Sequence, residues 1–317
     1  MMKKVVVLAL VVMFVATLGV FAAGAQEAAG PGLMVIVTPD KDNTFFTAEA
    51  DTAKTVAESL GYRTLLAVHG DDPMKESDII DSAISSKAVA IIIDVANSDA
   101  SPNNLRRAKN AGIPVFLMDR EINTTGIAEA QFISNNFQGA TLGAEHFVGL
   151  MKEKGNYIEL VGKESDTNAG VRSKGFHSII DQYPDMKMVA RETANWDQNE
   201  AYAKVESILQ SNPKVNGIIC GNDTMALGAQ AAVDSAGRSD IFVQGFDGND
   251  DVLDSIMMGK IDGTSMQPNA LNAEMAVKTA DKFIKTGATG LTEEKVLNGC
   301  FLITPANADQ WRGFTKK

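Results

Sequence analysis

The chain has 317 residues, two cysteines and a formal net charge of −11. This acidity argues against nucleic acid and anionic membrane surfaces as partners, because both are negatively charged. Two cysteines, Cys220 and Cys300, are too few for a disulfide scaffold, and the sequence leaves open whether they pair or stay free.

The N-terminal segment predicts export. Lys3 and Lys4 precede a charge-free apolar stretch over 5–23, and small residues occupy 23–25. This pattern is typical of a secretory signal peptide (residues 1–25) cleaved after Ala25. An uncleaved membrane anchor is the alternative, because the apolar stretch is nearly long enough to span a bilayer. Cleavage would leave 292 residues with a net charge of −13.

The remaining length and the hydropathy pattern predict two α/β domains. A chain of this size lies near the limit at which single cores divide. Apolar runs alternate with amphipathic segments from Leu33 onward, as in parallel sheets covered by helices. The predicted strands are 33–37, 64–68, 89–95, 115–118, 157–161, 215–220 and 241–246. The predicted helices are one that ends at Gly61 and those at 77–85, 101–111, 138–152, 200–210, 224–236 and 269–285.

Three short stretches predict crossings between the domains. Residues 130–135 are too short for a full strand–helix unit, 263–267 precede a second long helix, and the tail adds a short strand at 301–304. We therefore expect two doubly wound lobes joined by a multi-strand hinge, with a cleft between them. The expected boundaries are 32–134 plus 267–297 for the N-terminal lobe and 135–266 plus 298–317 for the C-terminal lobe.

Polar and aromatic side chains follow the predicted strands directly, which is where open α/β sheets bind ligands. The loop DKDNTFF at 40–46 offers Asn43, Phe45 and Phe46 instead of the glycines that suit a phosphate. Other strand ends, helices and crossovers carry carboxylates, guanidinium groups, amides and one more aromatic ring. These residues are Asp119, Arg120, Arg172, Trp196, Asn222, Asp247 and Gln267.

This mixture of side chains predicts an uncharged, polyhydroxylated ligand. Every sugar hydroxyl both donates and accepts hydrogen bonds, whereas the C–H faces of a sugar are apolar. Carboxylates accept from hydroxyls, guanidinium groups donate in a planar fork, and amides do both. The aromatic rings would enclose the carbon skeleton.

The same residues also have structural interpretations. Asn43 could serve only as the cap of the first helix, and the Asp-Arg pair at 119–120 could be an internal ion pair. Asp247 precedes a glycine and could belong to a turn. The phenylalanines at 45–46 could be core residues, although two adjacent helical residues cannot both face one core patch. A single ligand site accounts for all of these residues together.

The ordered set resembles the sugar-binding periplasmic proteins of ABC transporters, in particular the ribose-binding proteins. The matching segments extend from about Leu33 to Thr304: NTFF, with Thr44 where the family has proline, then MDRE, GVRSKGF, NWDQ, GNDTMALGA, GFDG and SMQP. The resemblance implies a type 1 periplasmic binding protein fold, a periplasmic monomer, and a ligand site lined by the ten residues named above. It also implies a sugar or polyol ligand delivered to a membrane ABC permease, to a chemoreceptor or to both, without a cofactor or metal.

The resemblance does not fix the ligand. Trp196 stands where the ribose binder has phenylalanine, and a larger ring alters the shape of the site. Pentose-like sugars and linear polyols such as pentitols or tetritols therefore both remain candidates.

An enzyme is the main alternative class. The sequence has neither a G-x-G-x-x-G after a strand nor a phosphate loop, and its three histidines lack metal-ligand spacing. Asp119 and Asp247 would have to act as acid and base of a glycosidase, but their basic and amide neighbours predict that both stay ionised. A repressor of the lactose-repressor type resembles this fold and site, but it carries a helix-turn-helix where this chain has an export signal.

Overall fold

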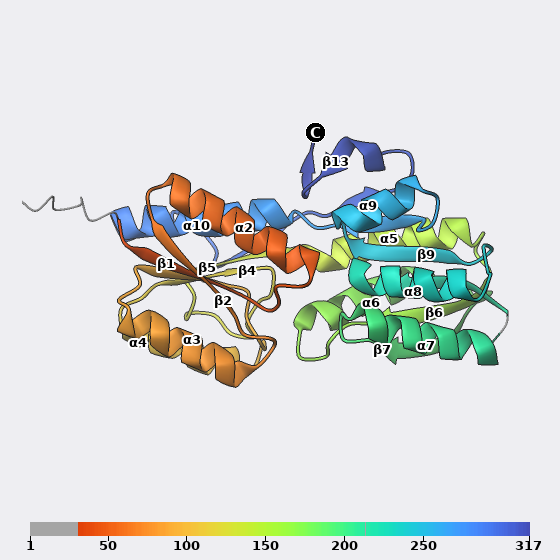
Figure 1. The fold of residues 1–317 in the computed structure, drawn as a ribbon, viewed down its shortest axis with the longest axis horizontal. Helices are drawn as coiled ribbons and strands as arrows, with labels where there is room; N and C mark the ends of the chain where they lie inside the picture. The colour runs from red at the N-terminus through yellow and green to blue at the C-terminus, as the bar shows by residue number, and fades with distance from the viewer. Residues whose placement is uncertain (1–30, 213) are drawn as a thin grey trace, which may run out of the picture.

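The computed structural model describes residues 31–212 and 214–317, and the predicted signal peptide therefore lies outside the described residues. Two lobes lie side by side along the long axis of the molecule (Figure 1). Each lobe contains a six-stranded sheet, with strand orders β11-β5-β4-β3-β1-β2 and β12-β10-β9-β8-β6-β7. The prediction of two doubly wound α/β lobes is confirmed.

The first sheet is parallel throughout and has helices on both faces. Its strands are β1 (Leu33–Thr38), β2 (Arg63–Val68), β3 (Ala90–Ile93), β4 (Val115–Met118), β5 (Ala130–Ser134) and β11 (Lys295–Asn298). One face carries α2 (Thr44–Ser59) and α10 (Asn269–Thr286), and the other carries α3 (Pro73–Ser85) and α4 (Ser101–Asn110).

The second sheet is parallel except for its last strand, which pairs antiparallel with β10. Its strands are β6 (Gly155–Val161), β7 (Met186–Thr193), β8 (Val215–Cys220), β9 (Phe242–Asp247), β10 (Gly263–Met266) and β12 (Phe301–Ile303). The helices α5 (Asn136–Leu150) and α6 (Thr167–Ile180) pack on one face. The helices α7 (Gln198–Ser211), α8 (Asp223–Ser235) and α9 (Asp250–Met257) pack on the other.

Helices on both faces of each sheet explain the unbroken apolar runs in the sequence. In β1, Val35 and Val37 point to the layer of α3 and α4, whereas Met34 and Ile36 point to the layer of α2 and α10. All four side chains are fully buried. Successive residues of a strand face opposite sides, so a strand covered on both faces has to be apolar at every position.

The chain passes between the sheets three times: after β5, between β10 and α10, and between β11 and β12. These are the segments at which the sequence predicts crossings. Each crossing leaves the carboxyl end of a parallel strand, namely β5, β10 or β11. The carboxyl ends of both parallel sheets therefore face the junction between the lobes (Figure 1).

The sequence pattern did not reveal β7, β11, α9 or the short elements of the tail after β12. In β7 only Met186 is buried, so this edge strand lacks an apolar run. The edge strand β11 has four residues, none of them buried, and α9 has eight residues, too few for a clear helical period. Elsewhere the differences concern element ends; for example, the predicted helix 77–85 begins at Pro73, with Asp72 as its cap.

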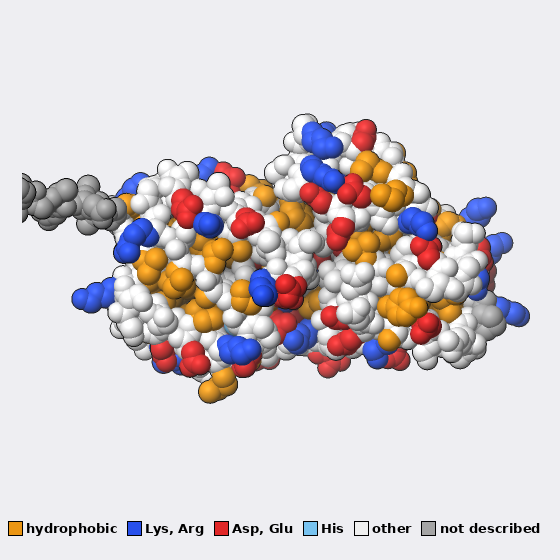
Figure 2. All heavy atoms as spheres, in the orientation of Figure 1, with side chains coloured by type: hydrophobic (Ala, Val, Ile, Leu, Met, Phe, Trp, Pro, Cys, Tyr) orange, Lys and Arg blue, Asp and Glu red, His pale blue; other side chains and the backbone are white. Residues whose placement is uncertain are grey.

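Cys220 and Cys300 are both buried and both free, which settles the question that the sequence left open. Among the described residues, no helix combines the length and the apolar character that crossing a bilayer requires. On the face shown in Figure 2, acidic and basic side chains are interspersed over both lobes.

Candidate ligand-binding site

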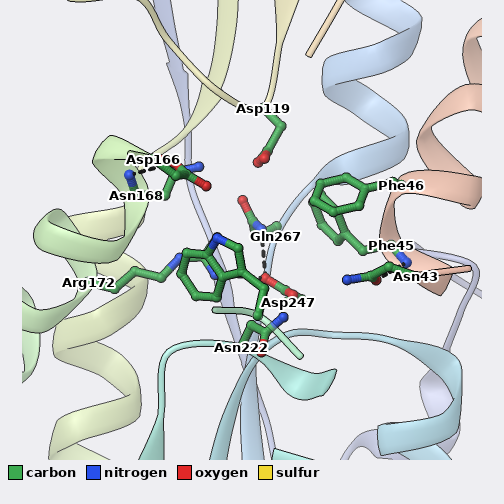
Figure 3. Close-up of a pocket in the computed structure, with 11 residues that line it drawn as sticks. Asn43, Phe45, Phe46, Asp119, Asp166, Asn168, Arg172, Asn222, Asp247 and Gln267 are labelled. Carbon is green, nitrogen blue, oxygen red and sulfur yellow. Dashed lines mark hydrogen bonds and ion pairs between the residues drawn. The ribbon is translucent and has the colours of Figure 1, made fainter. Parts of the chain in front are cut away.

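A small cavity lies between the carboxyl ends of the two sheets (Figure 3). Its lining comes from both lobes and from the crossover before α10. The lining residues are Asn43, Phe45, Phe46, Asp119, Asp166, Asn168, Arg172, Trp196, Asn222, Asp247 and Gln267. A molecule held in this cavity would contact both lobes at once.

Of the ten residues predicted from the sequence, all but Arg120 line this cavity. Arg120 is not among the lining residues, and three carboxylates lie close to its guanidinium group. Its Nη1 lies 2.6 Å from Asp71, and its Nε lies 3.0 Å from Asp166 and 3.5 Å from Asp94. Its guanidinium carbon is 5.1 Å from the centre of the Phe46 ring. Arg120 thus supports a lining aromatic ring and joins the lobes, because Asp166 belongs to the second lobe.

Asp119 and Asp247 are held in an unfavourable backbone conformation, with φ of 58° and 124°. Non-glycine residues with strained backbone angles cost on the order of 1–3 kcal/mol and cluster at functional sites. Asp247 Oδ1 accepts from Arg172 Nη1 at 3.0 Å and from Gln267 Nε2 at 2.8 Å. Asp119 enters the cavity from the opposite side (Figure 3). The ion pair considered between Asp119 and Arg120 is not present among the described contacts.

Burial raises the pKa of both carboxyls. Desolvation raises the pKa of Asp119 to about 7, and the charge of Asp166 adds to the effect while Arg172 and Arg120 oppose it. Desolvation raises the pKa of Asp247 to about 6 against the lowering effect of Arg172 and Gln267. Loss of water outweighs the basic and amide neighbours in both cases. At neutral pH Asp247 stays mostly ionised, as its neighbours predict, whereas Asp119 is close to half protonated. Hydroxyl donors from a ligand would favour the ionised form again.

Four buried polar atoms of the lining have no hydrogen-bond partner among the described residues. Two are acceptors, Asp119 Oδ1 and Gln267 Oε1, and two are donors, Asn168 Nδ2 and Trp196 Nε1. A buried polar atom without a partner costs about 1–3 kcal/mol. The lining therefore favours a ligand that both donates and accepts, as hydroxyl groups do.

Both phenylalanines of the first loop line the cavity. Phe45 and Phe46 are buried, and their rings meet edge to face with centroids 5.5 Å apart. Because α2 begins at Thr44, both lie in its first turn, where side chains lean toward the helix N-terminus and the cavity meets the helix end. Asn43 caps this helix by accepting from the Phe45 amide at 3.0 Å, so its capping role and its place in the lining coexist.

Trp196 forms another part of the wall, and glycines make room for it. A Cβ on Gly162 would lie 2.0 Å from the indole, and one on Gly221 would lie 3.1 Å from it. The guanidinium carbon of Arg172 is 5.3 Å from the Trp196 ring and 4.0 Å from the Phe246 ring. Arg172 is therefore fixed between two aromatic rings as well as by Asp247.

Two lining residues at the start of α6, Asp166 and Asn168, are absent from the set predicted from the sequence. Asp166 caps this helix by accepting from the Asn168 amide at 2.9 Å, and Asn168 Oδ1 accepts from Asn136 Nδ2 at 2.9 Å. Both residues follow the predicted strand 157–161, and this position at the carboxyl end of a strand is the sequence signal that identifies them. Within the described residues, no group of three or more His, Cys, Asp or Glu side chains is placed to hold a metal ion.

Comparisons with known proteins identify relatives of this chain. The profile of the periplasmic binding protein domain matches residues 34–289. The chain is 57% identical to the D-apiose import binding protein of Paraburkholderia graminis, over 92% of this chain and 93% of that protein. It is 30% identical to the ribose import binding protein of Escherichia coli, over 80% and 84% of the two chains.

A solved structure shares the fold. An ABC transporter solute binding protein from Bacillus halodurans, crystallised with bound myo-inositol, superimposes with a TM-score of 0.83 at 23% identity, over 92% of this chain and all of that one. The chain therefore belongs to the periplasmic binding protein family, among the sugar-binding proteins of ABC importers that its sequence motifs predict.

Proposed function

We propose that this protein captures D-apiose, a branched five-carbon sugar, between its lobes and delivers it unchanged to an ABC permease. The sugar is suggested by the relative at 57% identity, a D-apiose import binding protein.

The observation that carries the proposal is the set of four unpartnered polar atoms, two donors and two acceptors, inside a cavity walled by aromatic rings. Their charge environment favours a neutral ligand. Asp247 is paired with Arg172, and Asp166 is paired with Arg120. The pKa of Asp119, the remaining lining carboxyl, is raised to about 7.

We propose the following roles for the lining residues. Asp119 and Gln267 accept hydrogen bonds from sugar hydroxyls, whereas Asn168 and Trp196 donate hydrogen bonds to hydroxyl oxygens. The aromatic rings of both lobes cover the C–H faces of the sugar. The remaining lining residues complete the polar wall: Asn43, Asp166, Arg172, Asn222 and Asp247. Arg120 holds two of the lining residues, Phe46 and Asp166, through its guanidinium group.

Capture proceeds by closure of the lobes, whose proposed boundaries are 32–134 plus 267–297 and 135–266 plus 298–317. Membership of the two sheets supports this division. In the closed arrangement Lys163 lies 2.9 Å from Asp71 and Arg120 lies 3.0 Å from Asp166, each pair spanning the lobes. A sugar that contacts both lobes binds the closed form more tightly and so shifts the equilibrium toward it.

We further propose that the protein works as an exported periplasmic monomer and carries out no chemical step. Membership of a family of binding proteins supports the second point. Delivery to a chemoreceptor requires the same closed complex as delivery to a permease, so one protein can serve both.

A thermal-shift panel on refolded mature protein tests the ligand. A sugar at about 1,000 times its Kd stabilises by roughly 4 kcal/mol, which raises Tm by about 8–16 °C. We expect the largest shift with D-apiose and smaller shifts with D-ribose, pentitols and tetritols. A larger shift with a linear polyol would replace D-apiose as the ligand, and a flat panel would contradict sugar binding.

A further inference from the structure

After β12 the chain continues into a tail of η1 (Ala308–Gln310) and a hairpin of β13 (Trp311–Arg312) and β14 (Thr315–Lys316). These residues lie beyond 34–289, the segment that the family profile matches. The tail rises above α9 beside the junction of the lobes, where it forms a protrusion of the surface (Figures 1 and 2).

The hairpin is anchored to the second lobe through polar contacts on its outer side. Arg312 donates to both carboxylate oxygens of Asp254, at 2.8 and 3.0 Å. The Gly313 amide donates to Asp250 at 2.8 Å. The tail is therefore fixed to α9, the helix that follows Asp247 of the ligand cavity after a short turn.

Phe314, at the tip of the hairpin, reaches toward the other lobe. Its side chain is only 8% exposed, and its backbone adopts a φ of 59° that a bulky residue rarely takes. Its ring meets Phe45 edge to face, with centroids 5.6 Å apart and planes at 88°. Phe45 lies in α2 of the first lobe and itself packs edge to face on Phe46. Phe314 thus lies one ring behind the wall of the cavity.

We propose that Phe314 is a positioning residue for sugar binding, because lobe closure places its ring against Phe45 and holds both lining phenylalanines in their ligand-contacting orientation. This inference rests on the proposed function. Its ring is carried by the second lobe and its partner by the first, so the contact exists only in the closed form. Interactions confined to the bound, closed state act on the dissociation rate rather than on association.

The test is stopped-flow fluorescence of D-apiose binding to wild-type protein and to three variants. Phe314→Ala removes the ring pair, and Phe314→Leu keeps apolar bulk without the edge-to-face geometry. Phe301→Ala is the matched control, because Phe301 packs on Trp311 of the same hairpin, with centroids 5.3 Å apart, and is half exposed. Fluorescence of Trp196, which lines the cavity, reports binding.

We expect Phe314→Ala to raise the dissociation rate by on the order of tenfold with an association rate within about twofold of wild type. The dissociation rate of Phe314→Leu should lie between those of wild type and Phe314→Ala, and that of Phe301→Ala should equal the wild-type rate. A wild-type dissociation rate in Phe314→Leu and Phe314→Ala would overturn the inference, as would an equal increase in Phe301→Ala. Failure of the wild-type protein to bind any sugar would overturn the proposed function as well, so the two failures are distinguishable.

Discussion

Replacing Gly162 by alanine should move Trp196 out of the ligand cavity. The added methyl group would lie 2.0 Å from one indole carbon and 2.1 Å from two others. Ordinary contacts at such positions are 3.4–4 Å, so the indole has to retreat by more than 1 Å. The movement is resisted, because the Trp196 ring also lies against Arg172 and is buried.

The size of the effect follows from what the indole supplies. Its displacement removes an aromatic surface, worth about 0.5–1.5 kcal/mol beyond its area, and a hydrogen-bond donor worth about 1 kcal/mol. The sum of roughly 2 kcal/mol corresponds to a loss of affinity of about 30-fold. Overpacking in addition lowers the free energy of unfolding by about 1–3 kcal/mol.

Isothermal titration calorimetry with D-apiose measures this loss, and Gly170→Ala is the control. Gly170 lies in the same lobe, within α6, and a Cβ there meets no atom within 4 Å. The control should bind as wild type and be slightly more stable, because alanine favours a helix over glycine by about 1 kcal/mol. Wild-type affinity in Gly162→Ala, with a folded protein by circular dichroism, would show that the position of Trp196 does not determine binding.

Three further changes test other parts of the site and fold. Asp119→Asn should weaken sugar binding by roughly 10- to 100-fold in calorimetry, because a charged acceptor is lost. The same change should raise Tm of the ligand-free protein above neutral pH. Unchanged affinity would show that Asp119 does not contact the sugar. The hydrogen bond of His177 to Glu159 raises the histidine pKa to about 9. The stability it confers is complete below pH 6.5 and is lost as the pH rises through 9, so Tm should fall by a few degrees over that range, after allowance for its partial exposure. An equal fall in His177→Gln would refute this origin. Lys163→Ala should weaken binding less than about fivefold, and only at low salt, because its pair with Asp71 is partly exposed; a loss that persists at high salt would contradict an electrostatic contact.

Most of the site could be predicted from the sequence, because the residues that directly follow parallel strands line the ligand site. Parallel strands of one sheet end at the same edge, so residues far apart in sequence such as Asn43 and Asp119, which follow β1 and β4, lie at that edge together. The alternation of apolar runs with amphipathic segments likewise predicted both helix-covered parallel sheets. The elements without burial contrast, β7 among them, carried no such signal.

Three features of the site could not be predicted, because they depend on contacts between residues that are far apart in the sequence. Arg120 directly follows Asp119, but its environment is set by Asp71 and Asp94, which lie in loops after other strands. The raised pKa of Asp119 depends on exclusion of water by two lobes together, which residue types in a loop do not reveal. Asp166 reaches the site from the other lobe, so its pairing with Arg120 depends on closure.

The most direct test of the account is a calorimetric titration of mature protein, stripped of ligand by unfolding and refolding, with D-apiose. We expect one site per chain, tighter binding than for D-ribose or any pentitol, and loss of most of the affinity in Asp119→Asn. An absence of binding heat at several temperatures, from a protein that unfolds cooperatively, would contradict the central claim that the cavity between the lobes holds this sugar.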